Sequence, residues 1–172
     1  MKQMIHGIDH VGLTVPDIEE ATHFFIRALD AQVLYDTYKK TQPLRDSAFT
    51  KQRLGIPDSM SEAAIRMLVL PNGPGIELFE FVGEDQGKPC VPSDLGWQHV
   101  AFYVEDMTAA LTKVEAAGGI RNSEPVALSG LEAGKGNLFC YCLTPWGSTI
   151  ELISYPSRQP YLEQTSRRKW RV

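Results

Sequence analysis

The stretch H-V-G-L-T-V at residues 10–15 returns as H-V-A-F-Y-V at residues 99–104. The likeness continues beyond these stretches, where an aspartate and an alanine recur at matching positions. A second pair repeats in the same order, with P-N-G-P-G-I-E-L at 71–78 and P-W-G-S-T-I-E-L at 145–152. Repetition at two separate points of the chain predicts two tandem copies of one structural module.

Each copy reads as a strand, a helix and further strands. Residues 5–15 alternate in polarity and are rich in Ile and Val, which is typical of a strand. Asp17, with Glu20 three residues later, resembles a capping box and predicts the start of a helix. The apolar residues that follow have helical spacing and predict one buried stripe; they are Ile18, Ala21, Phe25, Ala28 and Leu29.

These patterns predict an α+β fold with one domain over residues 1–156 and a tail over 157–172. Module one covers 5–82, a linker covers 83–96, and module two covers 97–156. The first copy is longer, and segment 41–58 is the natural place for the excess. We expect a short helix there, around Asp46–Leu54, in a lid or a surface insertion. The remaining predicted elements are strands 31–39, 62–70 and 75–82 in module one, then strand 97–104, helix 106–117 and strands 124–128, 137–143 and 148–155 in module two.

Composition excludes several classes of protein. The formal net charge of −4 and the pI of about 5.6 provide no general attraction for nucleic acid. No apolar run approaches the roughly 20 residues needed to span a membrane, and the first residues lack the apolar core of a secretory signal. We therefore expect a cytoplasmic protein. The three cysteines have no paired spacing, which argues against a structural disulfide or a thiolate zinc site.

The basic tail S-R-R-K-W-R-V at 166–172 allows two interpretations. It could be a solvated or dimer-contacting terminus, or a clamp for an anionic group of a substrate.

Strand alternation selects a set of candidate metal ligands. His10 shares a strand face with Gly12, opposite the Val and Leu face that should pack on the helix. In the second copy His99 shares its face with Ala101. Each closing I-E-L stretch places a glutamate, Glu77 or Glu151, on the face away from its apolar neighbours. A carboxylate inside a strand is costly to bury unless it is paired or bound to a metal.

Each of these residues alone has a structural interpretation. A single strand histidine is usually a hydrogen-bonded core residue, and a single I-E-L glutamate usually lies at an exposed edge. Four residues at matching positions of a duplication favour a site for one divalent cation. Glu80 falls on the helix face of its strand and is a weaker rival to Glu77, while His6 and His23 have no counterpart in the second copy and are expected to be structural.

The chain resembles the vicinal oxygen chelate superfamily over about residues 5–156, on D-H-V-G-L-T-V-P-D, G-I-E-L, Q-H-V-A-F-Y-V and T-P-W-G-S-T-I-E-L. The superfamily includes glyoxalase I, methylmalonyl-CoA epimerase, extradiol dioxygenases and fosfomycin or bleomycin resistance proteins. The resemblance implies paired βαβββ modules whose sheets curl into an open barrel around a metal. It implies as ligands His10, Glu77, His99 and Glu151. Such nitrogen and oxygen ligands suit Zn, Ni, Co, Mn or Fe.

The expected function is a metal-dependent isomerase, epimerase or lyase acting on a small molecule with vicinal oxygens. Glu77 and Glu151 would serve as acid and base. Glu77 differs from the glutamine usual in methylmalonyl-CoA epimerases, and it also disfavours the alternative of an Fe(II) ring-cleaving dioxygenase, which uses two His and one Glu. Cyclitol epimerases stay possible, as does a metal-free drug-sequestering protein.

The full site needs one chain, although a homodimer is possible; no nucleic acid or membrane partner is expected. The expected cavity lining is Trp97, Tyr103, Phe79 and Phe81, and the basic residues that could hold an anionic group are Lys40, Arg53, Arg66 and Lys135.

Overall fold

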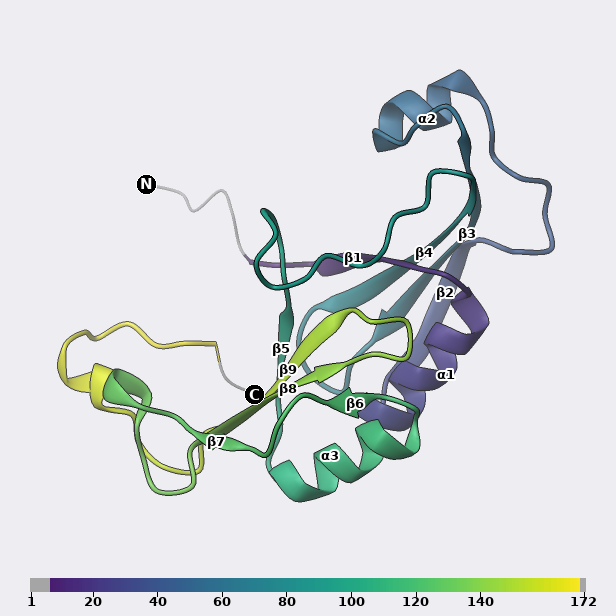
Figure 1. Cartoon of the computed structure of the whole chain (residues 1–172). Helices are drawn as coiled ribbons and strands as arrows, with labels where there is room; N and C mark the ends of the chain where they lie inside the picture. The colour runs from purple at the N-terminus through teal and green to yellow at the C-terminus, as the bar shows by residue number, and fades with distance from the viewer. Residues whose placement is uncertain (1–6, 171–172) are drawn as a thin grey trace. The chain divides into compact units, whose positions relative to one another are not determined.

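The computed structural model describes residues 7–170, and it contains two modules of the expected kind (Figure 1). The main division between the two compact units falls between Gly87 and Lys88. Each unit combines a β-sheet with helices, so the α+β class is confirmed. No helix among residues 7–170 has both the length and the apolarity that crossing a membrane requires.

Module one forms a sheet with strand order β1-β4-β3-β2. Strand β1 runs parallel to β4, and the other two pairings are antiparallel. Helix α1 follows β1, and the short helix α2 lies between β2 and β3. The bounds are β1 His10–Val15, α1 Ile18–Leu29, β2 Gln32–Tyr38, α2 Ala48–Leu54, β3 Met60–Val69 and β4 Gly75–Gly83.

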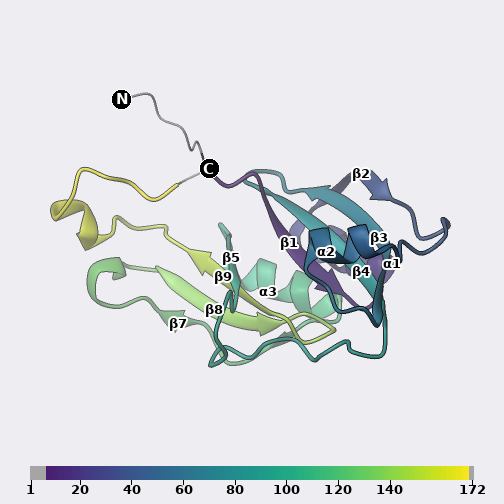
Figure 2. The ribbon, with the colours of Figure 1, turned by 90° about the horizontal axis from the view of Figure 1, so that it is seen from above.

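Module two repeats this topology with the order β5-β9-β8-β6. The short strand β7 also pairs with β8 (Figure 2). Strands β5 and β9 are parallel, as β1 and β4 are in module one. The bounds are β5 Val100–Tyr103, α3 Met107–Ala116, β6 Ile120–Arg121, β7 Val126–Ala127, β8 Leu138–Leu143 and β9 Thr149–Ser154, with the 3₁₀ turns η1 Gly130–Glu132 and η2 Pro160–Glu163.

Helix α1 begins where the sequence predicts. The Asp17 carboxylate caps it by accepting hydrogen bonds from the backbone N–H groups of Glu19 and Glu20, both at 2.9 Å. The helix ends at Leu29, and the C-cap residue Asp30 adopts a left-handed conformation with φ of 55°. The predicted stripe is buried apart from Leu29, which is only partly covered, and Phe24 joins it.

Segment 41–58 contains the expected short helix, capped by Ser47. Its start is fixed to β3 by Arg45, which exchanges two backbone hydrogen bonds with Glu62. The Arg45 guanidinium also donates to the buried Glu62 carboxylate at 2.8 Å and lies 3.8 Å from the centre of the Tyr38 ring. The insertion is therefore anchored by a charged contact that the sequence pattern did not reveal.

Several predicted boundaries need correction. Strand β1 begins at His10, where its pairing with β4 begins opposite Gly75, and residues 7–9 are not in a strand. Residues 5 and 6 of the predicted strand lie outside the described residues, as does His6. Strand β5 covers 100–103 within the predicted 97–104. Of the strand predicted near 124–128, only Val126–Ala127 (β7) is a strand, and β6 at Ile120–Arg121 was not predicted. The two short strands pair with opposite ends of β8.

The three cysteines are free thiols. Cys140 and Cys142 are buried on one face of β8, whereas Cys90 is exposed. Burial raises the pKa of the Cys142 thiol to about 12, so it is protonated near neutral pH and behaves as a small apolar side chain.

Candidate metal site

In module one, His10 and Glu77 lie next to each other on the face of the sheet opposite helix α1. The distance from His10 Nε2 to Glu77 Oε2 is 3.2 Å. His10 pairs with Gly75 across the parallel strands, and Glu77 pairs with Gly12, so the side chains of His10 and Glu77 are diagonal neighbours. Since Gly12 carries no side chain, it leaves space beside the carboxylate.

Module two reproduces this arrangement. The distance from His99 Nε2 to Glu151 Oε2 is again 3.2 Å. Ala101 pairs with Glu151, as Gly12 pairs with Glu77, so the register of the two parallel pairs is the same. The face assigned to His10 and Glu77 is thus confirmed. His99 lies one residue before β5 begins at Val100, and its contact with Glu151 places both side chains on the predicted face.

The second ring nitrogen of each histidine is held by the preceding residue. His10 Nδ1 lies 2.7 Å from the Asp9 carboxylate, and His99 Nδ1 lies 3.1 Å from the side-chain oxygen of Gln98. These oxygens accept a hydrogen bond, so in a neutral imidazole Nδ1 carries the proton and Nε2 presents its lone pair. The hydrogen bond to Asp9 also raises the pKa of His10.

This geometry fits a metal ion. A lone pair and a carboxylate oxygen repel each other at 3.2 Å unless a proton or a cation lies next to both. Two neighbouring ligands of one ion, with bonds of about 2.1 Å, are separated by about 3.0 to 3.4 Å. A hydrogen-bonded second nitrogen is also usual for a metal-bound histidine. Each pair therefore has the donor atoms and the spacing of half a coordination sphere.

The structure brings the four predicted ligands together as two pairs, one in each module. Among residues 7–170, no group of three or more His, Cys, Asp or Glu side chains is arranged to hold a metal. That both pairs share a single ion stays a prediction.

Glu151 has the more enclosed carboxylate of the two modules. Its side chain is 10% exposed, compared with 19% for Glu77. Burial raises the pKa of Glu151, and its interaction with His99 opposes this rise. A buried carboxylate next to an imidazole is a common arrangement for proton transfer.

Tyr141 is a site residue that the sequence analysis missed. It pairs with Glu151 across β8 and β9, and its ring meets the His99 ring edge-on, with 5.2 Å between centroids. Burial and the nearby Glu151 raise the pKa of Tyr141, so its hydroxyl remains a hydrogen-bond donor. Met67 occupies the corresponding position opposite Glu77 in module one. Alternation on β8 places Tyr141 opposite the two buried cysteines, but the register with β9 was needed to place it beside Glu151.

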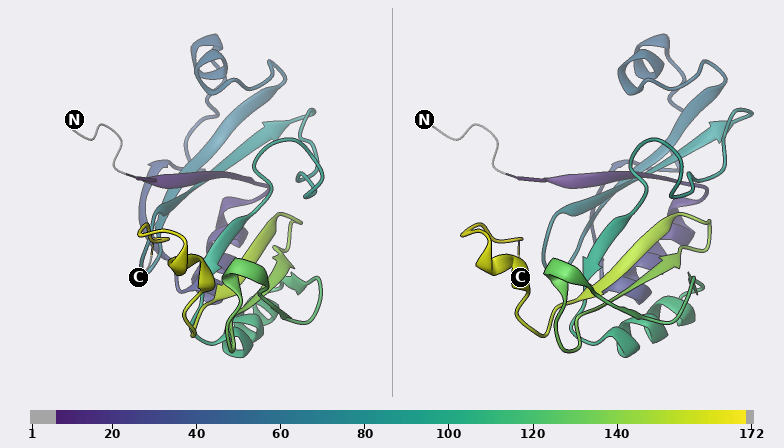
Figure 3. Two further views of the ribbon diagram at one scale, coloured as in Figure 1. Left: turned by 90° about the vertical axis from the view of Figure 1, so that its left-hand side faces the viewer. Right: turned by 60° about the vertical axis from the view of Figure 1, so that its left-hand side comes forward.

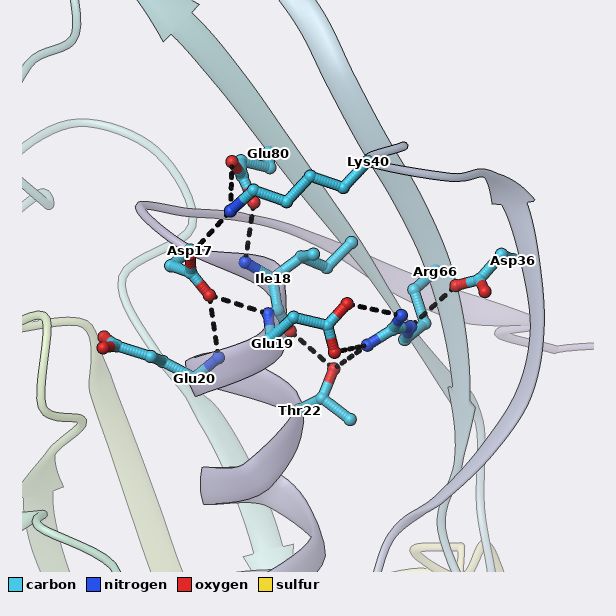
Figure 4. A network of polar contacts seen from close by, with 9 residues as sticks. All are labelled: Asp17, Ile18, Glu19, Glu20, Thr22, Asp36, Lys40, Arg66 and Glu80. Carbon is cyan, nitrogen blue, oxygen red and sulfur yellow. Dashed lines mark hydrogen bonds and ion pairs between the residues drawn. The ribbon is translucent and has the colours of Figure 1, made fainter. Parts of the chain in front are cut away.

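Glu80, the rival to Glu77, has a structural role (Figure 4). It is 3% exposed on the helix face of β4, and its carboxylate accepts a hydrogen bond of 2.8 Å from the backbone N–H of Ile18. Lys40 bridges this carboxylate and Asp17, at 2.9 and 2.6 Å. The two-residue period of the strand therefore predicted correctly that Glu80 lies on the helix face.

The four basic candidates for an anion-binding role have different environments. Lys40 forms ion pairs with Glu80 and Asp17. Arg66 forms ion pairs with Glu19 and Asp36, also on the side of the sheet that carries helix α1 (Figure 4). Arg53 lies 4.0 Å from the buried Glu62 carboxylate. The backbone carbonyl of Lys135 accepts a hydrogen bond from the Ser157 hydroxyl.

The aromatic residues expected to line a cavity also differ. Phe79 and Phe81 stack at 5.9 Å between centroids on the Glu77 face of β4, and Tyr103 stacks on Tyr155 at 5.7 Å. Trp97 is 100% exposed, and its expected place in the strand is wrong because β5 begins at Val100. His23 is exposed on α1.

Comparison with known proteins identifies relatives over most of the chain. Residues 9–141 match the family model of the glyoxalase/bleomycin resistance protein/dioxygenase superfamily. A 2-epi-5-epi-valiolone epimerase from Actinomyces sp is 32% identical over 163 residues, which cover 92% of this chain and 85% of that protein.

Solved structures share the fold at lower identity. A glyoxalase family protein from Bacillus cereus has a TM-score of 0.67 at 20% identity, covering 89% of this chain and 96% of that one. A mutant of the fosfomycin resistance protein FosX from Listeria monocytogenes, in complex with Mn(II) and 1S,2S-dihydroxypropylphosphonic acid, has a TM-score of 0.59 at 15% identity. That match covers 94% of this chain and 100% of the FosX chain.

Proposed function

Because the chain belongs to the glyoxalase/bleomycin resistance protein/dioxygenase superfamily, we propose that it is a divalent-metal-dependent epimerase of a small, oxygen-chelating substrate. The epimerase from Actinomyces sp supports this choice within the superfamily, because its similarity extends over both modules. The substrate in its name, 2-epi-5-epi-valiolone, is the first compound to test.

One observation carries the proposal: both modules present a histidine and a glutamate at the same register, with 3.2 Å between Nε2 and Oε2. The ligands would be His10, Glu77, His99 and Glu151, and the ion Zn, Ni, Co, Mn or Fe. Two imidazoles and two carboxylates balance the charge of a divalent cation.

When bound, a divalent ion supplies Lewis acidity, which polarises a substrate carbonyl and makes the neighbouring C–H bond more acidic. Glu77 and Glu151 come from different modules and would act on opposite faces of the substrate. One group, as the carboxylate, would remove the proton from the carbon, and the other, first protonated from solvent, would deliver its proton to the opposite face of that carbon. One C–H bond breaks and one forms, so the configuration inverts with no net oxidation. Tyr141 would donate a hydrogen bond to the substrate oxygen beside Glu151.

The two alternative functions have weaker support. A ring-cleaving dioxygenase needs three protein ligands, whereas here Glu77 is positioned beside His10 just as Glu151 is beside His99. A metal-free sequestering protein would have no need for two intact His–Glu pairs with anchored Nδ1 atoms.

The test is metal analysis of the purified protein followed by incubation with 2-epi-5-epi-valiolone in D₂O. We expect a divalent metal and an epimerised product with one deuterium at the inverted carbon. A panel of hydroxyketones, cyclitols and acyl-CoAs would define the range of substrates. Oxygen uptake with catechols, or no deuterium incorporation into any compound of the panel, would contradict the proposal.

A further inference from the structure

Two tyrosines extend the His99–Glu151 face of module two. Tyr103 on β5 pairs with Ile153, and Tyr155 lies two residues beyond that partner. His99 and Glu151 have the same diagonal relationship four residues earlier, so all four side chains fall on one face. The 5.7 Å stacking of the two tyrosine rings is consistent with this placement.

The end of the described chain returns to these tyrosines. Turn η2 lies beside η1 (Figure 3). In the segment after η2, the Lys169 ammonium contacts Tyr155. The Lys169 ammonium is 3.3 Å from the Tyr155 hydroxyl and 5.0 Å from the centre of its ring. It also pairs with the Glu132 carboxylate of η1, and the Lys169 backbone N–H donates to the Tyr161 hydroxyl at 3.2 Å. One basic residue of the tail is thus held at a defined point.

The charges around Lys169 determine which group it could recognise. Glu132 neutralises its ammonium, and both residues act electrostatically on Glu151. A phosphate or carboxylate here would be repelled by two glutamates, which argues against the anionic clamp considered from the sequence. A neutral hydroxyl group would find a donor in Lys169, an acceptor in Glu132 and either role in Tyr155.

We propose that Lys169, with Tyr155 and Glu132, binds a hydroxyl group at the end of the substrate remote from the metal ligands. This inference rests on the proposed function, because it places the reacting end of the substrate at His99 and Glu151. Glu151 and Tyr155 are four residues apart, which corresponds to about 13 Å at the rise of a strand. Lys169 is therefore a specificity-determining residue that contacts substrate away from the reacting carbon.

The test compares Lys169→Met with Arg168→Met. The neighbouring Arg168 is a matched control, because its guanidinium bonds only to the backbone carbonyls of Thr165 and Arg167 among the described residues. Binding of 2-epi-5-epi-valiolone to Mn²⁺-loaded protein is measured by calorimetry, and turnover by deuterium incorporation. Binding of Mn²⁺ alone to each variant shows whether the metal ligands are intact.

For Lys169→Met we expect KM and Kd to rise about tenfold, the loss typical of one hydrogen bond to a charged group, with kcat within threefold and Mn²⁺ affinity unchanged. Tyr155→Phe should raise KM by a smaller factor, and Arg168→Met should leave it within twofold. Unchanged affinity in Lys169→Met, an equal loss in Arg168→Met, or no binding of the neutral ketone to wild type would each overturn the inference. Lys169-dependent binding without turnover would instead refute the proposed epimerase activity alone.

Discussion

Gly12 lies directly opposite Glu77 across the parallel strands β1 and β4, and Ala101 lies opposite Glu151 in the same way. Glycine and alanine, the two smallest residues, thus occupy the positions beside the two carboxylates. A Cβ atom added to Gly12 would lie 3.6 Å from Phe79 Cε2, an ordinary contact distance. The residue type at position 12 is therefore limited by the space beside Glu77 and not by the backbone conformation.

Gly12→Ala should therefore keep metal affinity and kcat within about threefold of wild type, since alanine already serves at position 101. Gly12→Leu should reduce both by at least tenfold, because its side chain would fill the space next to Glu77. Metal titration and turnover of the two variants provide the comparison, with Ala101→Gly as the reciprocal control. Full activity in Gly12→Leu would show that this space is not used.

Glu77→Gln and Glu151→Gln should each reduce turnover by at least about a thousandfold while part of the metal affinity survives. Each amide keeps the side-chain size but removes a proton acceptor and one negative charge. Deuterium exchange and metal titration separate the two effects. Glu84→Gln is the control, because Glu84 lies exposed just after β4. Full turnover in both site variants would exclude the assigned roles.

Tyr141→Phe should lower kcat by about ten- to a hundredfold and leave metal affinity unchanged. The substitution removes the hydroxyl but preserves the ring contact with His99. A steady-state comparison with Tyr35→Phe, a change at an exposed tyrosine of β2, controls for general effects. If kcat stayed the same, Tyr141 would be only a packing residue.

Lys40→Met should destabilise module one by about 1 to 3 kcal/mol, because it leaves the buried Glu80 carboxylate without its cation. Urea unfolding measures this loss, and kcat of the folded protein should not change. Lys39→Met is the neighbouring control. An equal loss of stability in both variants would show that the Lys40–Glu80 contact contributes little.

Acid should weaken the same network. Hydrogen bonds from Lys40 and from backbone N–H groups hold the pKa of Asp17 below its ordinary value of 3.8. A carboxylate with a depressed pKa in the folded state contributes stability above its unfolded pKa, and this contribution is lost as the pH falls through the folded value. Urea midpoints measured from about pH 6 to pH 2 should therefore fall less steeply for Asp17→Asn, which retains a capping side chain. Identical slopes for the two proteins would contradict this.

The repeat and the strand period were enough to predict most of the candidate site. Once His10 and Ile76 are placed on strands, the two-residue period determines which faces Glu77 and Glu80 occupy. The structure confirms both faces. It also confirms the helix that starts after Asp17, because a local hydrogen-bonding signal determines that start.

The remaining features depend on contacts between distant parts of the chain. Trp97 was misplaced because the start of β5 depends on where β9 begins to pair with it. Tyr141 requires the register of β8 on β9, and the pairing of Lys40 with Glu80 joins residues from separate elements. Periodicity within one segment carries no information on these relationships.

The two modules have the same strand register but different surroundings for their carboxylates. Tyr141 stands beside Glu151 where Met67 stands beside Glu77, and a neutral Gln98 holds His99 where the anionic Asp9 holds His10. Under the proposed function, the two carboxylates must take different roles, because one removes a proton and the other returns one. An exact repeat would give both carboxylates the same immediate neighbours, so the divergence at these positions provides the difference between acid and base that such a reaction requires.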